Sequence, residues 1–128
     1  MAVARSILVV DDEPSIVDAL ADVLRWEGYP VLTASNGERA LEELARGRAS
    51  LVLLDYMMPV MDGLLALERI RADPAWRSIP VVVMTAAQLP TGASGWDGLL
   101  RKPFEVDALF ELVRSLAGPP PARAPDPS

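Results

Sequence analysis

The chain has 128 residues and a formal net charge of −6, and it contains neither cysteine nor histidine. The absence of these two residue types excludes disulfides, thiolate zinc sites, cysteine nucleophiles, histidine bases and Ser-His-Asp catalysis. The acidic balance argues against a nucleic-acid partner, because such a surface needs a basic patch. With 51% apolar residues and no apolar run long enough to cross a bilayer, we expect a soluble, cytoplasmic globular chain without a membrane partner.

Strands and helices are expected to alternate along the chain. Short apolar runs rich in β-branched residues predict buried strands, and apolar residues three and four apart predict amphipathic helices. In chain order we expect a strand at 6–10, a helix at 14–26, a strand at 28–34, a helix at 35–47, a strand at 50–55, a helix at 62–72, strands at 79–85 and 98–102, and a helix at 105–116. Pro14 suits a helix start, Ser35 or Asn36 can cap the second helix, and Gly47 can end it. This alternation predicts βαβ units and a parallel sheet covered on both faces.

Two segments depart from the alternation. Residues 86–97 contain a proline, two glycines and little apolar periodicity. We therefore expect a shortened or degenerate fourth helix there, and the most mobile part of the folded core. Residues 118–128 contain five prolines, which predicts a flexible, extended tail after a folded domain at residues 1–117.

Polar side chains follow the expected strands at their carboxyl ends. Asp11 and Asp12 come at the end of the first strand, Asp55 ends the third, Thr85 ends the fourth and Lys102 ends the fifth. Ligands of open parallel sheets bind at this edge. If the first and third strands are neighbours, three carboxylates converge, and such a cluster calls for a cation. Oxygen ligands in a chain without histidine or cysteine point to Mg²⁺ or Mn²⁺, with Lys102 as a second positive charge.

Four blocks of the sequence, "LVVDDEPSIV", "LVLLDYMMPVMDGL", "VVVMTA" and "LLRKPF", resemble the signature set of CheY-like response regulator receiver domains. The blocks keep the family's order and spacing, and the resemblance covers roughly residues 6–117. It implies an α/β fold with a doubly wound, five-stranded parallel sheet in the order 2-1-3-4-5.

The resemblance implies roles for the acidic residues. Asp55 matches the aspartate that accepts a phosphoryl group from the phosphohistidine of a histidine kinase or phosphotransfer protein. Asp11 and Asp12 match the acidic pair that holds Mg²⁺ together with Asp55 and the main-chain carbonyl of Met57. The resemblance thus implies metal-dependent phosphorylation of an aspartate.

The resemblance also covers the residues that respond to phosphorylation. Lys102 matches the lysine that pairs with a phosphoryl oxygen, Thr85 the hydroxyl that binds another, and Pro103 the proline of a cis peptide bond. Leu99 stands where the family usually has Tyr or Phe, and Trp96 lies three residues earlier. We therefore expect intact phosphorylation chemistry with an altered readout.

Several of these features also have a purely structural interpretation. Residues 11–13 could complement the dipole at the start of the following helix. The Lys102-Pro103 pair could form an ordinary turn before the last helix. Gly63, directly after Asp62, could be simple turn chemistry.

From the sequence we expect a single-domain response regulator that switches its contacts with an unidentified protein target, as a monomer or weak dimer. We expect it to catalyse only its own phosphorylation and dephosphorylation. One alternative is a receiver-like interaction module that works without phosphorylation. Another is a metal-dependent aspartyl phosphatase, although such enzymes typically carry D-x-D where this chain has adjacent Asp11 and Asp12. A nucleotide-binding fold is disfavoured, because no G-x-G-x-x-G follows the first strand.

Overall fold

Five parallel strands form one sheet in the order β2-β1-β3-β4-β5, as the resemblance implies. The computed structural model describes residues 6–58 and 60–121. The elements in chain order are β1 Ser6–Val10, α1 Pro14–Glu27, β2 Val31–Ala34, α2 Gly37–Ala45, β3 Ala49–Asp55, α3 Gly63–Ala72, β4 Val81–Thr85, β5 Gly98–Arg101 and α4 Val106–Ala117. Of the predicted domain and tail, residues 1–5, 59 and 122–128 lie outside the described residues. No helix within the described ranges is long and apolar enough to cross a membrane.

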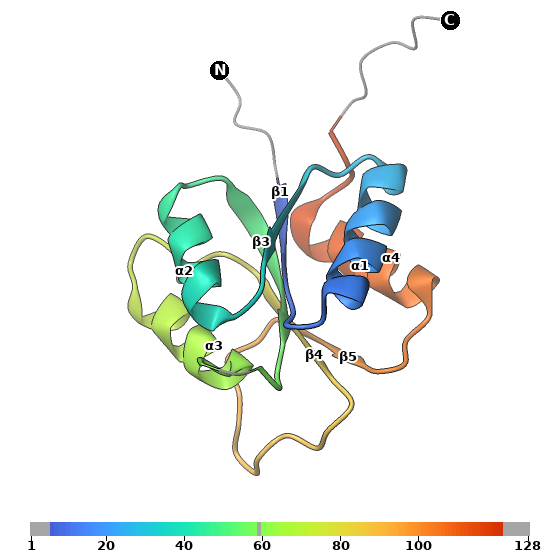
Figure 1. The fold of residues 1–128 in the computed structure, drawn as a ribbon. Helices are drawn as coiled ribbons and strands as arrows, with labels where there is room; N and C mark the ends of the chain where they lie inside the picture. Colours follow the sequence, from blue (N-terminus) through green and yellow to red (C-terminus); the bar gives the residue numbers. More distant parts are fainter. Residues whose placement is uncertain (1–5, 59, 122–128) are drawn as a thin grey trace, which may run out of the picture.

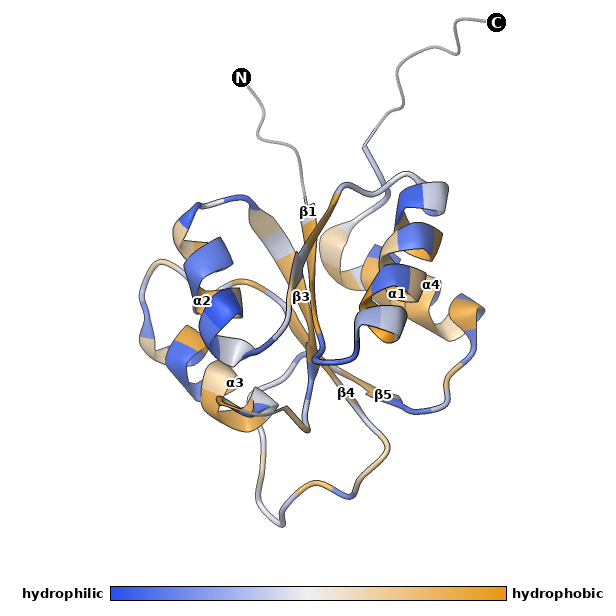
Figure 2. Ribbon diagram, viewed as in Figure 1, coloured by the Kyte–Doolittle hydropathy of each residue, from blue (hydrophilic) through white to orange (hydrophobic). Residues whose placement is uncertain are grey.

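The helices cover the two faces of the sheet in pairs, α1 with α4 and α2 with α3 (Figure 1). Successive residues of a strand point to opposite faces, so an unbroken apolar strand serves two cores. On β1, Ile7 and Val9 belong to the core beneath α1 and α4, whereas Leu8 and Val10 belong to the core beneath α2 and α3. Figure 2 shows the apolar strands at the centre and the hydrophilic helix faces directed outward.

Local signals in the sequence place the helix ends. The Asn36 side chain accepts a hydrogen bond from the Arg39 amide at 2.8 Å, so Asn36, and not Ser35, caps α2. Gly28 ends α1 in the left-handed conformation, with φ of 111°. The strand predicted at 28–34 is therefore shorter than expected, because its first residues close the preceding helix.

Residues 86–97, which join β4 to β5, contain no helix, so even the shortened helix allowed by the sequence is absent from this described segment. Gly92 and Gly95 adopt positive φ values of 85° and 108°, which a right-handed helix excludes. Leu89 and Trp96 pack against the core beneath α2 and α3. The segment thus crosses the sheet as an extended loop with two apolar anchors.

Arg71 of α3 fixes the end of this loop. Its guanidinium donates hydrogen bonds to the carbonyl oxygens of Gly95 and Ile79, both at 2.8 Å, and to Asp97 Oδ2 at 2.6 Å. Asp97 Oδ2 also accepts a hydrogen bond from the Val81 amide at 2.8 Å. One arginine therefore joins α3, the start of β4 and the residue before β5.

We expect the amides of residues 86–96 to exchange with deuterium much faster than those of β1, β3 and β4. Within this described segment only the amides of Ala87 and Ala93 donate hydrogen bonds, and few buried side chains resist local opening. Amide exchange followed by mass spectrometry or NMR would measure this. Slow exchange throughout the segment would contradict this prediction and would mean that the loop is rigid.

Candidate functional site

The sheet register brings the predicted acidic residues together. Val10 pairs with Leu54, so Asp11 after β1 lies next to Asp55 at the end of β3. Asp11 and Asp55 are nearly buried, with 1% and 5% of their surfaces exposed, whereas the neighbouring Asp12 is exposed. The two central strands therefore deliver two buried carboxylates and one exposed carboxylate to the same edge.

Lys102 is the cation of this cluster. Its Nζ lies 3.0 Å from Asp11 Oδ2 and 3.0 Å from Asp55 Oδ1. The Lys102 amide also donates a hydrogen bond to the main-chain carbonyl of Thr85 at 2.9 Å. This bond holds the Lys102 backbone directly after β5, beside the end of β4. The sequence predicted a lysine at this edge but not that it would bridge two of the carboxylates.

The charges of the cluster are unbalanced in the metal-free protein. Burial raises the pKa of the Asp55 carboxyl above its ordinary value, the charges of Asp11 and Asp12 add to this rise, and the hydrogen bond from Lys102 opposes it. Burial alone would lower the pKa of the Lys102 ammonium, but its hydrogen bonds to Asp11 and Asp55 raise it above its ordinary value. The cluster therefore holds three carboxyl groups and one ammonium group, so it can bind a further positive charge.

The donor set fits a hard divalent cation. One carboxylate oxygen each from Asp11, Asp12 and Asp55 lies within 4.8 Å of the others. Carboxylate oxygens are the ligands that Mg²⁺ and Mn²⁺ prefer. The Met57 side chain is exposed, and the role of its main-chain carbonyl as a further ligand stays a prediction.

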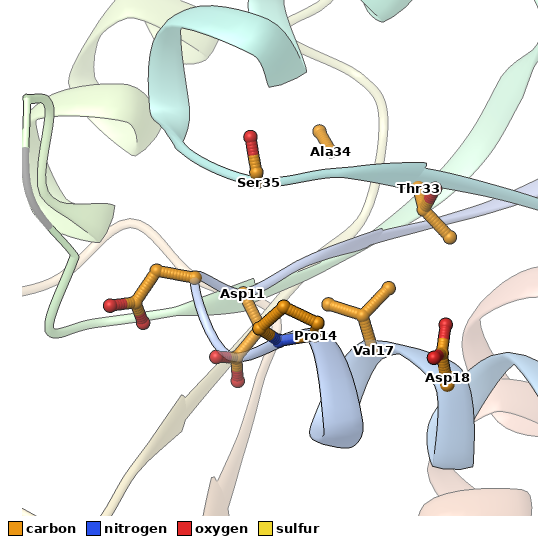
Figure 3. Close-up of a pocket in the computed structure, with 8 residues that line it drawn as sticks. Asp11, Pro14, Val17, Asp18, Thr33, Ala34 and Ser35 are labelled. Carbon is orange, nitrogen blue, oxygen red and sulfur yellow. The ribbon is translucent and has the colours of Figure 1, made fainter.

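A hollow of about 180 Å³ opens beside the cluster, between the start of α1 and the end of β2 (Figure 3). Its walls are formed by Asp11, Asp12, Pro14, Val17, Asp18, Thr33, Ala34 and Ser35. In Figure 3 the side chains of Val17 and Asp18 face the end of β2 across this space. The hollow leaves the α1 side of the acidic edge open to a small ligand.

Thr85 reaches the same edge from β4, but its hydroxyl is bonded to the following loop. Thr85 Oγ1 donates to the carbonyl oxygen of Ala87 at 2.9 Å and accepts from the Ala87 amide at 2.9 Å. The side chain is buried, with 1% of the residue exposed. The hydroxyl must therefore redirect its proton before it can donate to a group on Asp55.

Three further residues were singled out by the sequence, and only Pro103 follows β5 at this edge, whereas Trp96 and Leu99 lie at the start of β5. The peptide bond between Lys102 and Pro103 is cis. Leu99 and Trp96 are half-buried and pack on the same core, beneath α2 and α3. Trp96, near the end of the loop of residues 86–97, therefore shares one face of the sheet with Leu99 of β5.

Two residues have structural roles that sequence reasoning described only in part. Asp11 Oδ1 accepts a hydrogen bond from the Glu13 amide at 3.0 Å, so this carboxylate also orders the turn before α1. Gly63 has no positive φ, but a Cβ atom on it would lie 2.4 Å from the Asp55 carbonyl oxygen. Glycine is thus required by close packing of α3 against the end of β3, and the adjacent Asp-Gly pair signalled only a turn.

We expect Lys102→Ala to bind Mg²⁺ at least as tightly as the wild type. Removing the ammonium frees Asp11 and Asp55 for a metal and removes a repelling charge. The metal-free variant should lose about 2 kcal/mol of stability, since two charged hydrogen bonds disappear from a buried cluster. Calorimetric Mg²⁺ titration and chemical denaturation would measure these effects.

The matched control for Lys102→Ala is Arg39→Ala, which removes a cation from an exposed pair with Glu42 at 3.6 Å. Such pairs contribute roughly 0–1 kcal/mol, so its stability should change little. Loss of Mg²⁺ binding in a folded Lys102→Ala protein would show that the lysine supports metal binding and does not compete with it.

Comparison with known proteins agrees with this geometry. The family model of the response regulator receiver domain matches residues 7–114. The response regulator Rre1 of Synechocystis is 37% identical over 123 residues, which cover 91% of this chain and 53% of Rre1. The chain spans about half or less of the length of the curated relatives that it matches.

Two solved structures have the same fold. The response regulator TrrA of Thermotoga maritima, in complex with Mg²⁺ and BeF, has a TM-score of 0.80 and 37% identity, covering 88% of this chain and 98% of that one. The receiver domain of the sensor histidine kinase PA1611 of Pseudomonas aeruginosa, with magnesium in its active-site cleft, has a TM-score of 0.82 and 30% identity, covering 90% and 98%. The family match, the strand order and the acidic edge together show that this chain belongs to the response regulator receiver domains.

Proposed function

We propose that this chain accepts a phosphoryl group on Asp55 from the phosphohistidine of a histidine kinase or phosphotransfer protein, and that phosphorylation switches its contacts with a protein target. The arrangement around Asp55 carries the proposal. Asp55 lies at the end of the central strand β3, bonded to Lys102 and adjacent to the carboxylates of Asp11 and Asp12. A nucleophilic carboxylate, a cation and two more oxygen ligands therefore share one strand edge.

The transfer requires little covalent chemistry from the protein. An Asp55 carboxylate oxygen forms a bond to phosphorus, and the bond from phosphorus to the donor's imidazole nitrogen breaks, leaving its electron pair on the imidazole. Lys102 Nζ, held near Asp55 by its second hydrogen bond to Asp11, is placed to pair with an oxygen of the transferred group. Positioning and electrostatics of this kind account for most catalysis of phosphoryl transfer.

Asp11, Asp12, Asp55 and the main-chain carbonyl of Met57 would hold Mg²⁺ or Mn²⁺ in this proposal. When bound, the cation supplies positive charge that offsets the charge of the phosphoryl oxygens. The clustering of the three carboxylates supports this assignment, as do the magnesium ions in the related TrrA and PA1611 structures.

Incubation with acetyl phosphate and Mg²⁺ tests the proposal without the cognate kinase. We expect the intact mass to rise by one phosphoryl group, and we expect no rise with Asp55→Asn or after chelation of the metal. A wild-type protein that stays unmodified, while binding its target equally well with and without Mg²⁺, would favour the phosphorylation-independent interaction module. Turnover of added phosphomonoesters would favour a phosphatase.

A further inference from the structure

We infer that Arg101 is a positioning residue that allows the Thr85 hydroxyl to leave the loop when Asp55 is phosphorylated. This inference rests on the proposed function, and it concerns how that function is transmitted. It is based on one main-chain carbonyl, that of Ala87, to which both side chains donate hydrogen bonds. Thr85 Oγ1 donates to the Ala87 oxygen at 2.9 Å, and Arg101 Nη1 donates to it at 3.3 Å.

The sheet register fixes this arrangement. Thr85 is the last residue of β4 and pairs with Arg101, the last residue of β5. Directly paired residues of neighbouring parallel strands point to the same face, so both side chains approach the loop from the same side of the sheet. Thr85 is buried and Arg101 is exposed, so Ala87 lies between an interior hydroxyl and a surface guanidinium.

A carbonyl oxygen can accept two hydrogen bonds, and here it does. When the Thr85 hydroxyl turns its proton towards a phosphoryl group, the Ala87 oxygen loses one donor. Ala87 is half-buried, and a half-buried carbonyl without a donor is unfavourable. Arg101 keeps this oxygen bonded, so it lowers the free-energy cost of the change at Thr85.

The same connection provides a route to the surface in a receiver that lacks the usual aromatic residue. Leu99 lies two residues before Arg101 on β5, and therefore on the same face of the strand. Leu99 has no polar group that could form a hydrogen bond in response to a change at the Thr85 hydroxyl. Arg101 has one, because its guanidinium and the Thr85 hydroxyl donate to the same carbonyl oxygen.

The test is a double-mutant cycle that measures beryllofluoride affinity in saturating Mg²⁺, with beryllofluoride as the phosphoryl analogue. Arg101→Met removes the donors but keeps a long side chain. In the wild-type background it should weaken beryllofluoride binding about fivefold, the usual effect of one hydrogen bond. In a Thr85→Ala background, where the Ala87 oxygen receives the same bonds before and after binding, Arg101→Met should change the affinity by less than about twofold.

Arg48→Met is the matched control, because it removes one positive charge from an exposed arginine directly before β3, at the opposite end of the strand from Asp55. It should leave the affinity unchanged. Arg101→Leu should repeat the Arg101→Met result and serves if the methionine variant folds poorly. Equal weakening by Arg101→Met in both backgrounds would indicate a general charge effect and overturn the inference, as would no weakening in either.

The same experiment separates the inference from the function on which it rests. If the wild-type protein binds no beryllofluoride with Mg²⁺, the proposed phosphorylation of Asp55 is wrong and the role of Arg101 falls with it. If the wild type binds beryllofluoride but the two mutations have additive effects, the phosphorylation site stands and only the role of Arg101 is wrong.

Discussion

Asp55→Asn should bind Mg²⁺ roughly tenfold or more weakly than the wild type, yet its metal-free form should be more stable by about 1 kcal/mol. Both effects have one cause, because the substitution removes a metal ligand and also one of three mutually repelling carboxylates. Lys102 keeps its other hydrogen bond to Asp11. Calorimetric titration with Mg²⁺ and urea denaturation in a chelator would measure the two effects separately.

The stability gain should depend on pH with a definite sign. The pKa of Asp55 is raised in the folded protein, so the folded state holds this proton more tightly than the unfolded state. As pH rises from the ordinary aspartate range through the raised pKa of Asp55, ionisation of Asp55 therefore lowers the stability of the wild type. Asparagine does not ionise, so Asp55→Asn should gain stability relative to the wild type across this window and keep the gain at neutral pH.

Asp22→Asn is the matched control, because Asp22 is exposed on α1 and does not belong to the carboxylate cluster. It removes the same charge and should change neither Mg²⁺ affinity nor stability by much. Two results would contradict this prediction: an Mg²⁺ affinity of Asp55→Asn equal to that of the wild type, or a metal-free variant less stable than the wild type. Either would mean that repulsion among the three carboxylates does not destabilise the metal-free protein, or that Asp55 is not a metal ligand.

Gly63→Ala should destabilise the domain by about 3 kcal/mol. The added Cβ atom would lie 2.4 Å from the Asp55 carbonyl oxygen and 2.9 Å from the Tyr56 Cα. Both are backbone atoms, so α3 would have to move away from the end of β3. The Gly63 amide donates to the Tyr56 carbonyl at 2.9 Å, and that hydrogen bond would be strained as well.

Gly92→Ala separates this clash from ordinary glycine effects. A Cβ atom on Gly92 meets nothing within 4 Å, but the residue has φ of 85°. Its replacement should therefore cost about 1 kcal/mol from backbone strain alone. Thermal and urea denaturation of both variants would compare the two costs. Equal losses of stability in the two variants would mean that α3 shifts at little cost, so that close packing at Gly63 does not require glycine.

The sequence predicted the parts of the fold that depend on local patterns. The apolar β-branched runs placed the strands, and the acids at their ends predicted the carboxylate cluster because parallel strands share an edge. Strand order is a long-range property, and only the resemblance of four blocks to a known family implied it. Periodicity within each block carries no information about which strands pair.

The features that the sequence did not reveal depend on tertiary contacts that no local pattern encodes. The bridge from Lys102 to Asp11 spans 91 positions, and the requirement for Gly63 comes from packing against β3. Arg71 and Asp97, 26 positions apart, had no motif to mark them. Local propensity correctly excluded a full helix at residues 86–97, but it could not show that Arg71 anchors the end of the loop that replaces the helix.

The Tyr29 hydroxyl donates a hydrogen bond to the carbonyl oxygen of Gly118 at 2.7 Å, directly after α4. Figure 1 shows that the start of β1 and the end of α4 lie at the same end of the molecule, opposite the carboxyl ends of the strands. A fluorescent protein fused beyond Gly118, or a linker to a sensor chip attached there, would sit away from Asp55. Biosensors built on this domain should therefore be tethered through the α4 end, which leaves the acidic edge accessible.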